Sequence, residues 1–330
     1  MKLVITGGTG CLGKPLLDGL IKSGHDVQLL VLPQDTSVEA IRGVRMIKGD
    51  VSSYESLKTL TKECQIILHL AGKVHSVSKS EIEEQEYYRI NVDGTKNLLE
   101  AAKVNKVNRI VFFSTVGVYG KDADFQGDEL SPCCPLTAYA KSKFIAEKLV
   151  LDTVKDGGPE GVVLRFPVVY GPLDRGNVAA LIKAVRKKQF FYFGDGNCLR
   201  SMISSKNAAE AATKAAFEPE AADELFCVTD GRDYTMNELV NSICRALGTR
   251  RQPYHVPVLL ADLAGRCGDF LRKRASVPFP IDSDRVRKLS RSLTFSCEKA
   301  KRILGYKAQH TLIEGITDEV EWLSKTHGWK

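Results

Sequence analysis

The stretch Leu3-Val4-Ile5-Thr6-Gly7-Gly8-Thr9-Gly10-Cys11-Leu12-Gly13 begins as an apolar run and ends in glycines spaced three residues apart. Residues 3–5 predict a buried strand, and the periodicity of residues 12–21 predicts a helix directly after the turn. Such a turn presents backbone N–H groups and the positive end of a helix dipole to an anion. Glycines at Gly7, Gly10 and Gly13 let a diphosphate approach the backbone, so we expect a dinucleotide cradle. The alternative is a glycine-rich turn without a ligand.

The composition is that of an ordinary soluble chain. With 330 residues, 43% of them hydrophobic, the chain can bury a full core in one large α/β domain or in two unequal ones. No apolar run approaches the roughly 20 residues that a membrane span requires. Only two residues precede the first predicted strand, and we therefore expect a cytoplasmic protein.

The nine cysteines are scattered and form no CxxC pair, which predicts reduced, mostly buried thiols and no metal site. A net charge of +7 is modest for this length, and aromatic residues are not interleaved with the basic ones, so we expect no nucleic-acid partner. The basic excess gathers late in the chain, at Arg266, Arg272, Lys273, Arg274, Arg285, Arg287, Lys288 and Arg291. A solvated face is the simpler interpretation; the alternative is attraction of an anionic substrate or lipid headgroup.

Strands and helices alternate through the first half of the chain, which predicts a parallel sheet. Predicted strands cover residues 26–31, 44–48, 65–70, 109–113 and 162–166. Because ligands bind at the carboxyl ends of such strands, we expect contacts from the residues at those ends. These residues include Asp50, Ala71, Gly72, Ser114, Thr115 and Phe166. His69 lies inside an apolar strand, where a hydrogen-bonded core histidine is the expected interpretation.

One long helix is predicted from about Glu83 to Val104, and it brings Asn91 within reach of the site. The next helix, capped by Thr137, carries Tyr139 and Lys143 four residues apart, on one face. An ammonium beside a phenol favours the phenolate, so we expect Lys143 to lower the pKa of Tyr139 until the phenol can act as a base. A lone pair of this spacing is often two surface residues. Here it comes after a strand that ends in Ser114-Thr115, in a chain that opens with a cofactor cradle, and this order favours catalysis.

The alternation becomes less regular after residue 170. We predict a dinucleotide-binding domain over residues 1–170, to which a strand near 225–228 returns, and a smaller substrate-binding lobe over residues 171–330. Helices are expected at about 177–188, 206–217 and 235–248, the last with the capping box Thr235-Met236-Asn237-Glu238. A further helix over residues 257–274 is apolar on one side and basic at its end. Packing on the lobe is its expected role, rather than contact with a membrane surface.

These motifs resemble those of the extended short-chain dehydrogenase/reductases, and within them the NAD-dependent epimerase/dehydratase family. The resemblance covers essentially the whole chain. Its markers are residues 7–13, Gly49-Asp50-Val51, His69-Leu70-Ala71-Gly72, Asn91-Val92-Asp93-Gly94-Thr95, Ser114-Thr115 before Val118-Tyr119-Gly120, Tyr139-Ala140-Lys141-Ser142-Lys143, residues 166–172, Arg200-Ser201-Met202-Ile203 and residues 296–301.

The resemblance implies an α/β fold with a Rossmann-type doubly wound parallel sheet, a smaller C-terminal substrate lobe, and Thr115, Tyr139 and Lys143 as catalytic residues. It implies cofactor contacts from Gly7, Gly10, Cys11, Leu12, Gly13, Asp50, Val51, Leu70, Ala71, Gly72, Asn91, Ser114, Tyr139, Lys143, Phe166 and Val169. In members that act on nucleotide sugars, residues at the positions of Asn177 and Arg200 bind the diphosphate. A second arginine that binds the diphosphate could be Arg285, Arg287 or Arg291, and the resemblance does not choose among them.

The chain departs from the family pattern at two positions. Val31 replaces the acidic residue expected after the second strand, so NAD is the expected cofactor while NADP stays open. Thr115 replaces the commoner serine and keeps the hydroxyl.

The leading hypothesis is a nucleotide-sugar epimerase that acts at C4 of a UDP-hexose or UDP-N-acetylhexosamine. The alternatives are a reductase or dehydrogenase of an apolar alcohol or ketone, resembling the 3β-hydroxysteroid or dihydroflavonol branches, and a cofactor-sensing module without activity. We also expect a homodimer, because the helices near residues 83–104 and 137–154 carry more apolar positions than one sheet contact requires. Family members pair these helices in a four-helix bundle.

Overall fold

A seven-stranded parallel sheet forms the centre of the larger unit in the computed structural model, which describes residues 1–35, 41–74, 81–121, 123–249, 253–260, 262–263, 286 and 290–329. Its strand order is β11-β7-β5-β4-β1-β2-β3. The strands are β1 (Lys2–Thr6), β2 (Asp26–Val31), β3 (Val44–Lys48), β4 (Ile66–His69), β5 (Arg109–Thr115), β7 (Glu160–Phe166) and β11 (Leu225–Cys227). The order reverses between β1 and β4, and a crevice at such a switch point is where ligands bind in open α/β sheets. The prediction of a doubly wound, Rossmann-type sheet is confirmed.

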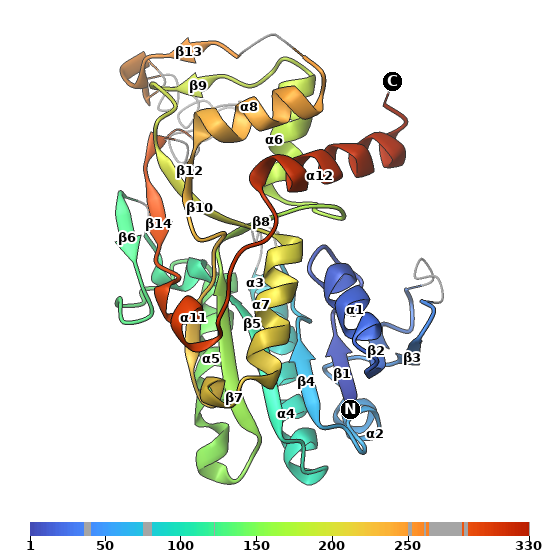
Figure 1. Ribbon diagram of the computed structural model, residues 1–330. Coiled ribbons are helices and arrows are strands. Elements are labelled where there is room, and N and C mark those ends of the chain that lie inside the picture. The colour runs from blue at the N-terminus through green and yellow to red at the C-terminus, as the bar shows by residue number, and fades with distance from the viewer. Residues whose placement is uncertain are drawn as a thin grey trace.

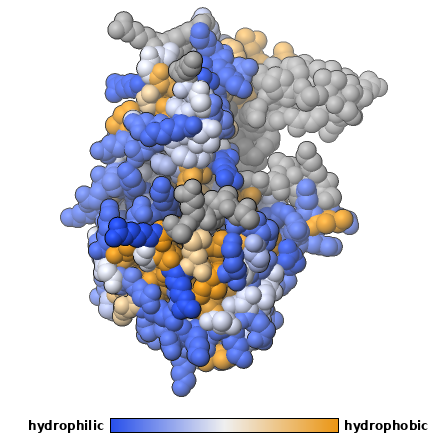
Figure 2. Space-filling model, turned by 90° about the vertical axis from the view of Figure 1, so that its right-hand side faces the viewer, coloured by the Kyte–Doolittle hydropathy of each residue, from blue (hydrophilic) through white to orange (hydrophobic). Residues whose placement is uncertain are grey.

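Helices cover both faces of this sheet (Figure 1). On one face pack α1 (Gly13–Lys22) and the alanine-rich α7 (Ser205–Phe217); on the other pack α2 (Tyr54–Leu60), α4 (Gly94–Val104) and α5 (Ala138–Asp152). Strand alternation explains the two cores, because Leu3 and Ile5 of β1 face the first set of helices and Val4 faces the second. The edge strand β3 is only partly buried and carries Arg45 and Lys48. Figure 2 shows a mainly hydrophilic surface on the side of the molecule to which this edge belongs.

The helix predicted from Glu83 to Val104 is interrupted. The structure has α3 (Glu81–Tyr88), one π-helical turn (Arg89–Asp93) and then α4. The wide turn contains Asn91, whose buried side chain leaves the helix surface and bonds to a neighbouring loop and to α5. Helical periodicity does not reveal such a turn, because one inserted residue leaves the helical appearance of the sequence on either side intact.

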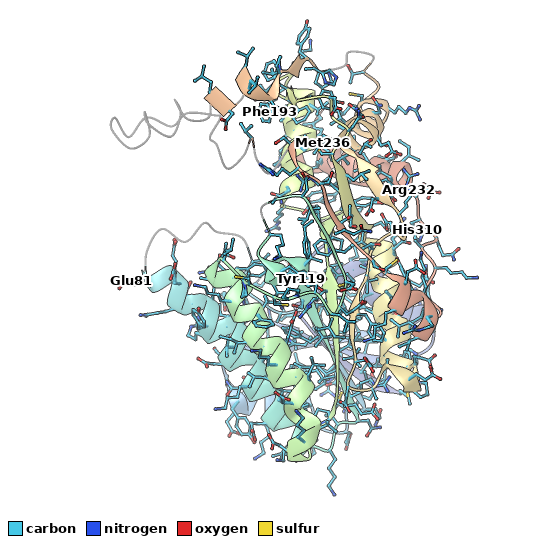
Figure 3. All side chains as sticks on the ribbon, turned by 90° about the vertical axis from the view of Figure 1, so that its left-hand side faces the viewer. Glu81, Tyr119, Phe193, Arg232, Met236 and His310 are labelled. Atoms are coloured by element: carbon cyan, nitrogen blue, oxygen red, sulfur yellow. The ribbon has the colours of Figure 1, made fainter. Side chains whose placement is uncertain are left out.

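The smaller unit contains a second sheet, with strand order β12-β10-β14-β6 and with β8 paired to β10. Its strands are β6 (Phe125–Gly127), β8 (Val168–Tyr170), β10 (Leu199–Ser204), β12 (Asp233–Thr235) and β14 (Leu293–Phe295). Around it lie α6 (Asn177–Arg186), α8 (Met236–Ala246), α11 (Glu298–Ile303) and α12 (Leu312–His327), and the short strands β9 (Tyr192–Phe193) and β13 (His255–Val256) pair with each other. Figure 3 shows Phe193 and Met236 in this unit, and Glu81 and Tyr119 in the unit below it.

The chain passes between the two units more often than a simple division at residue 170 implies. The strand β6, from the loop after β5, pairs with β14 in the smaller unit. The strand β11 runs back to the larger sheet and pairs with β7 in parallel, which agrees with the strand expected near residues 225–228. The division at residue 170 stays a prediction.

Several local predictions are confirmed by the helix ends. The Thr137 hydroxyl accepts a hydrogen bond from the N–H of Ala140 and caps α5. Thr235 and Glu238 form the expected capping box of α8. Most of the predicted helix over residues 257–274 lies outside the described residues, as do Arg266, Arg272, Lys273, Arg274, Arg285, Arg287 and Lys288 of the basic cluster.

Where this helix is described, its apolar side chains are largely uncovered, and Leu259 is 86% exposed. Val258 nevertheless lies beside Gly194 of the smaller unit. The packing of the whole helix on the lobe stays a prediction, because most of the helix lies outside the described residues. No helix among the described residues has the length and apolar character needed to cross a bilayer.

Candidate active site

The loop between β1 and α1 depends on two glycines that have no room for a side chain. A Cβ atom on Gly7, whose φ is +74°, would lie 2.4 Å from the backbone nitrogen of Ala71. A Cβ atom on Gly13 would lie 2.1 Å from the carbonyl oxygen of Gly8. At Gly10 a Cβ atom would meet nothing within 4 Å. The loop is therefore tightly packed on β4 and on itself, and it is open over Gly10.

The N-terminus of α1 is uncapped. Leu12 stands at its N-cap without a side-chain hydrogen bond, and the first turn has no acidic residue. By contrast, α2, α5, α7 and α8 are capped by Ser53, Thr137, Ser204 and Thr235. Backbone N–H groups at an uncapped helix start, next to an open glycine loop, suit the diphosphate of a dinucleotide. The residues present thus fit a bound dinucleotide.

The other residues expected to touch the cofactor lie around the same crevice. Leu70, Ala71 and Gly72 come directly after β4 and are half-buried. Cys11 of the glycine loop lies 3.7 Å (Sγ to O) from the carbonyl of Gly171. Asp50 accepts hydrogen bonds from the N–H and hydroxyl of Ser52. Three further residues of the expected set are Val51, buried beyond β3, Phe166, which ends β7, and Val169 in β8.

Two uncharged residues stand at the end of β2. Val31 is buried and Leu32 is 43% exposed. Neither offers a carboxylate to a ribose diol or a cation to a 2′-phosphate, so the tip of β2 does not discriminate between the two dinucleotides by charge.

The two hydroxyl residues at the end of β5 point in opposite directions, as neighbours in a strand do. Ser114 is buried and donates a hydrogen bond of 2.5 Å to Glu147. Thr115 accepts from the N–H of Gly117 at 3.1 Å and contacts Tyr139. The hydroxyl of Ser114 is thus directed to Glu147 and that of Thr115 to Tyr139. The expected cofactor contact of Ser114 stays a prediction.

Tyr139 and Lys143 lie one turn apart on α5. The ring of Tyr139 is 6.1 Å from that of Tyr87 on α3 (centroid to centroid). Lys143 is buried, and its Nζ lies 3.9 Å from the centre of the Phe112 ring. The helix thus carries a phenol and an ammonium side by side, at the carboxyl end of β5.

The pKa values of this pair differ from the expectation. Burial raises the pKa of Tyr139 to about 12, although a hydrogen bond with Thr115 acts in the opposite direction. Burial also lowers the pKa of Lys143 to about 7, against the influence of Glu147. The prediction that Lys143 lowers the pKa of Tyr139 is therefore wrong for the chain without ligands. Desolvation outweighs the spacing of the two groups.

Asn91 and Lys143 both lie beside Gly72. The ideal Cβ position of Gly72 is 3.0 Å from Oδ1 of Asn91 and 3.8 Å from Nζ of Lys143. Asn91 accepts from the N–H of Lys73 at 2.7 Å and donates to the hydroxyl of Ser142 at 2.9 Å. The amide thus ties the loop after β4 to α5, which places it within the site as predicted.

His69 lies behind the glycine loop as a core residue. Its ring nitrogens lie 2.6 Å from the hydroxyl of Thr6 and 3.0 Å from that of Thr95. Burial lowers its pKa to about 3, so the ring is neutral. The interpretation of His69 as a hydrogen-bonded core histidine is confirmed.

Arg200 in β10 interacts with Cys198 but keeps two buried donors without acceptors among the described residues. Its Nε and Nη2 atoms are buried and have no hydrogen-bond partner among the described residues. Burial lowers the pKa of this guanidinium. Unmade hydrogen bonds of a buried cation cost stability, and an anion at this position would satisfy them. Asn177 is exposed at the start of α6, Arg291 is exposed, and Arg285 and Arg287 lie outside the described residues.

Three residues near the site were not predicted from the sequence. Glu147 lies four residues after Lys143, and its helical spacing was the one available signal. Arg165 of β7 pairs with Glu147, which requires knowledge that β7 lies beside β5. Glu319 of α12 is fully buried and accepts from the N–H of Gly171 at 2.8 Å, and burial raises its pKa to about 9. No local sequence signal links this late residue to the glycine loop.

Substitutions at Gly13 and Gly10 should affect different properties, the first the stability of the fold and the second the affinity for the cofactor. We expect Gly13→Ala to lower the free energy of unfolding by at least about 1–3 kcal/mol, because its methyl group collides with backbone. Gly10→Ala has room in the protein, so its stability should match the wild type within about 0.5 kcal/mol. Its methyl group occupies the open space above the loop, and NAD affinity should fall at least about tenfold. Urea denaturation and calorimetric titration with NAD measure both. Unchanged NAD affinity of Gly10→Ala would place the diphosphate elsewhere.

Similar proteins include epimerases and a reductase. The N-acetyl-alpha-D-glucosaminyl-diphospho-ditrans,octacis-undecaprenol 4-epimerase of Escherichia coli O157:H7 is 28% identical over 97% of this chain and 94% of its own. The 4-hydroxy-2-methyl-3-oxo-4-farnesyl-3,4-dihydroquinoline-1-oxide ketoreductase of Stigmatella aurantiaca is 30% identical over 96% and 95%. The structure of MoeE5 in complex with UDP-glucose and NAD matches with a TM-score of 0.74 and 27% identity, over 99% of this chain and 100% of that one.

The family assignment rests on the first two thirds of the chain, which contain the glycine loop, the Tyr139 and Lys143 pair and the whole large sheet. A model of the NAD dependent epimerase/dehydratase family matches residues 3–229. The chain is therefore an enzyme of the NAD dependent epimerase/dehydratase family.

Proposed function

We propose that the chain is a 4-epimerase of a hexose or N-acetylhexosamine carried on a diphosphate, with a UDP-sugar as the simplest substrate. The observation that carries this proposal is Arg200, a buried guanidinium with two donors that have no partner among the described residues. Two parallel hydrogen bonds from one guanidinium match the geometry of a phosphate. A diphosphate-linked sugar would supply that anion in the smaller unit and leave its ring for the residues of α5 and β5.

The proposed chemistry assigns one task to each residue. Burial raises the pKa of Tyr139 to about 12, so the proposed reaction requires that Tyr139 first lose its own proton. As the phenolate, Tyr139 takes the proton from the sugar 4-hydroxyl, and Thr115 donates a hydrogen bond to the reacting oxygen. Lys143 supplies positive charge beside the phenol and binds the ribose next to the nicotinamide. NAD, when bound, supplies the acceptor for the C4 hydride and later returns it. The keto-sugar turns over between the two transfers, so hydride and proton return to give the opposite configuration with no net redox change.

The relatives support a sugar diphosphate as the substrate class. The Escherichia coli relative is named as a 4-epimerase of a sugar linked through a diphosphate to a polyprenol, and MoeE5 was solved with UDP-glucose. The two ligands share a hexose on a diphosphate and differ in the group at the other end of the diphosphate, a polyprenol in one and uridine in the other. The proposed interaction of Arg200 is with the diphosphate, which both ligands contain.

The direct test is epimerisation by the purified protein. UDP-galactose or UDP-N-acetylgalactosamine should yield the 4-epimer without net formation of NADH, and Tyr139→Phe should lower kcat about 10²- to 10⁴-fold because the general base is lost. Chromatography of the sugar nucleotides and absorbance at 340 nm measure both products. The polyprenyl-diphosphate sugar is tested in parallel in detergent. No epimer from any of these substrates would contradict the proposal.

A reductase of an apolar ketone or alcohol is the second candidate, because the Stigmatella aurantiaca ketoreductase is as similar as the epimerase. Stoichiometric oxidation of NADH or NADPH by such a ketone, without epimerisation of a sugar, would support the reductase over the epimerase. A cofactor-sensing module would bind NAD and show equal, negligible turnover in the wild type and Tyr139→Phe.

Arg200 should act on affinity more than on the chemical step. A charge-assisted hydrogen bond contributes roughly 1.5–3 kcal/mol, so Arg200→Ala should weaken UDP binding about tenfold to a hundredfold and raise KM similarly. Arg232→Ala is the matched control, because Arg232 is exposed and paired with Glu238. Calorimetric titration with UDP measures the effect without knowledge of the sugar. Equal UDP affinity of Arg200→Ala and the wild type would remove the main support for a nucleotide-linked substrate.

We also propose a homodimer formed by α3, α4 and α5. These helices lie side by side on one outer face of the large sheet (Figure 3), and apolar side chains remain uncovered on them: Ile82, Val104 and Ile145. A second copy would bury these side chains. Sedimentation at micromolar concentration should give twice the monomer mass of 36.4 kDa, and Ile145→Glu should reduce it to the monomer. A wild-type protein that sediments only as a monomer would refute this.

A further inference from the structure

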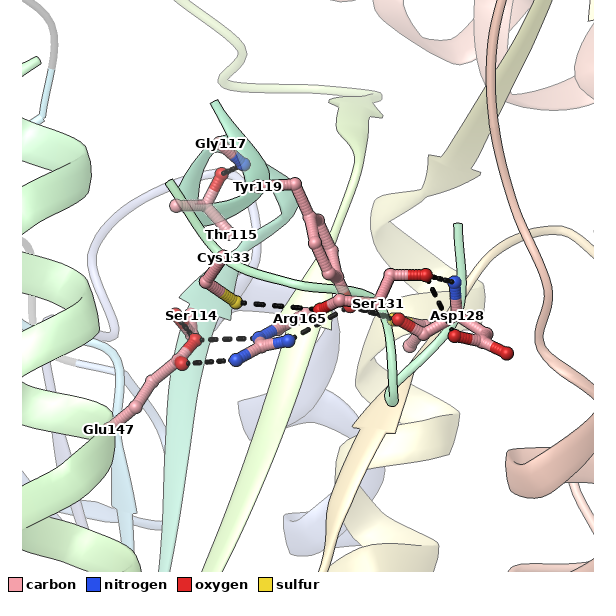
Figure 4. Close-up of polar contacts among 10 residues, drawn as sticks. Ser114, Thr115, Gly117, Tyr119, Asp128, Ser131, Cys133, Glu147 and Arg165 are labelled. Carbon is pink, nitrogen blue, oxygen red and sulfur yellow. Dashed lines mark hydrogen bonds and ion pairs between the residues drawn. The ribbon is translucent and has the colours of Figure 1, made fainter. Parts of the chain in front are cut away.

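A buried ion pair lies beside Ser114, at the end of β5 that also carries Thr115 (Figure 4). Glu147 of α5 and Arg165 of β7 are 1% and 4% exposed. Two parallel hydrogen bonds join them, from Nε to Oε1 at 3.0 Å and from Nη2 to Oε2 at 2.7 Å. Both carboxylate oxygens therefore have fixed directions.

The ion pair connects four segments around the site. Ser114, at the end of β5, donates to Oε1 of Glu147 at 2.5 Å. The remaining guanidinium nitrogen of Arg165 donates to the hydroxyl of Tyr119 at 2.9 Å, in the turn after β5. That hydroxyl in turn donates to the carbonyl of Asp128 at 2.6 Å. The helix that carries Tyr139 is thus tied to the strand that carries Thr115.

A buried ion pair is an inefficient way to stabilise a fold, because the desolvation of two charges offsets much of their attraction. An apolar pair of similar volume would fill the same space. The position of this pair suggests another role, since Glu147 lies one helical turn from Lys143 and Ser114 is the neighbour of Thr115.

The charged groups around Lys143 identify Glu147 as the residue that stabilises its positive charge. Its carboxylate favours the ammonium form, whereas burial opposes it. On β4, His69 is neutral, and on α5 Tyr139 carries no negative charge while it is protonated. Arg165 of β7 is cationic and its charge is directed to Glu147. Among the described residues around Lys143, Glu147 is the anion that favours its ammonium form.

We propose that Glu147, held by Arg165 and Ser114, is a positioning residue that keeps Lys143 cationic and fixes α5 against β5 for proton transfer by Tyr139. The inference rests on the proposed role of Tyr139 and Lys143 in the reaction. Glu147 itself acts through its neighbours and touches neither the substrate nor the cofactor.

A second ion pair, between β5 and β7, provides the control. Arg109 and Glu160 join the beginnings of β5 and β7, with Nη2 to Oε2 at 2.7 Å. Arg109 is buried like Arg165, and the pair lies at the end of the sheet opposite to the site. Glu160 is more exposed than Glu147, with 44% of its side chain accessible against 1%. Glu160→Gln therefore removes an arginine-paired carboxylate far from the reacting groups, and it controls for the loss of one negative charge.

The test compares Glu147→Gln with Glu160→Gln in the full chain. Lysine labelled with ¹³C at Cε reports the titration of Lys143 by NMR, with Lys143→Arg to assign the signal. We expect the Lys143 midpoint to fall by about one pH unit in Glu147→Gln, because an opposite charge one helical turn away favours the charged form of the lysine. It should stay unchanged in Glu160→Gln. With an active sugar substrate, the alkaline limb of kcat should move to lower pH in Glu147→Gln, while KM changes less than about twofold.

Each result of the NMR titration either supports or overturns the proposed role of Glu147. A Lys143 midpoint in Glu147→Gln equal to that of the wild type overturns the proposal, as does an equal shift in Glu160→Gln. If Glu147→Gln does not fold, Glu147→Asp keeps an acceptor for Arg165 and withdraws the charge from Lys143. Its midpoint should then lie below that of the wild type, and equality would refute the proposal. The NMR titration needs no sugar, so an absence of epimerisation contradicts the proposed function and leaves this test intact.

Discussion

The fold depends on one steric constraint, the close passage of the first loop across the neighbouring strand. At Gly7 the backbone of the loop lies so near Ala71 that no Cβ atom fits, and at Gly13 it lies equally near Gly8. These contacts fix the start of α1 over the switch point of the sheet, between β1 and β4. The same constraint leaves the helix N-terminus uncapped and open. Packing and anion binding therefore depend on the same few residues.

Charge is distributed around the site in two different ways. Glu147 and Arg165 are hydrogen-bonded to each other inside the protein, and Ser114 and Tyr119 supply their further partners. Arg200 lies at the other side of the crevice, in the smaller unit, with donors that the described residues leave unused. The paired charges of Glu147 and Arg165 suit groups that must keep their position during a reaction. The unpaired donors of Arg200 suit a group that binds a ligand. The contrast separates the rigid part of the site from the part that selects the substrate.

Local spacing was sufficient to predict the glycine loop and the Tyr139 and Lys143 pair, because each depends on neighbours within one turn or one strand. The alternation of strands and helices predicted a parallel sheet, and its doubly wound order was predicted from the resemblance to the family. Burial was not predictable in this way. The pKa of Tyr139 rises because the pocket is desolvated, which no spacing reveals. Ser114 turns away from the crevice by strand alternation, a rule that was available from the sequence. The pairing of Arg165 with Glu147 required the spatial order of β5 and β7, which lie 51 positions apart in register.

The exchange of strands between the two units has a consequence for folding. The strand β6 leaves the first half of the chain to pair with β14, and β11 returns from the second half to pair with β7. A chain cut near residue 170 would lack β11 and leave β7 as an unpaired sheet edge, a surface that invites association with other chains. The same cut would separate β6 from its partner. The two units therefore complete each other, and they should unfold in a single cooperative transition.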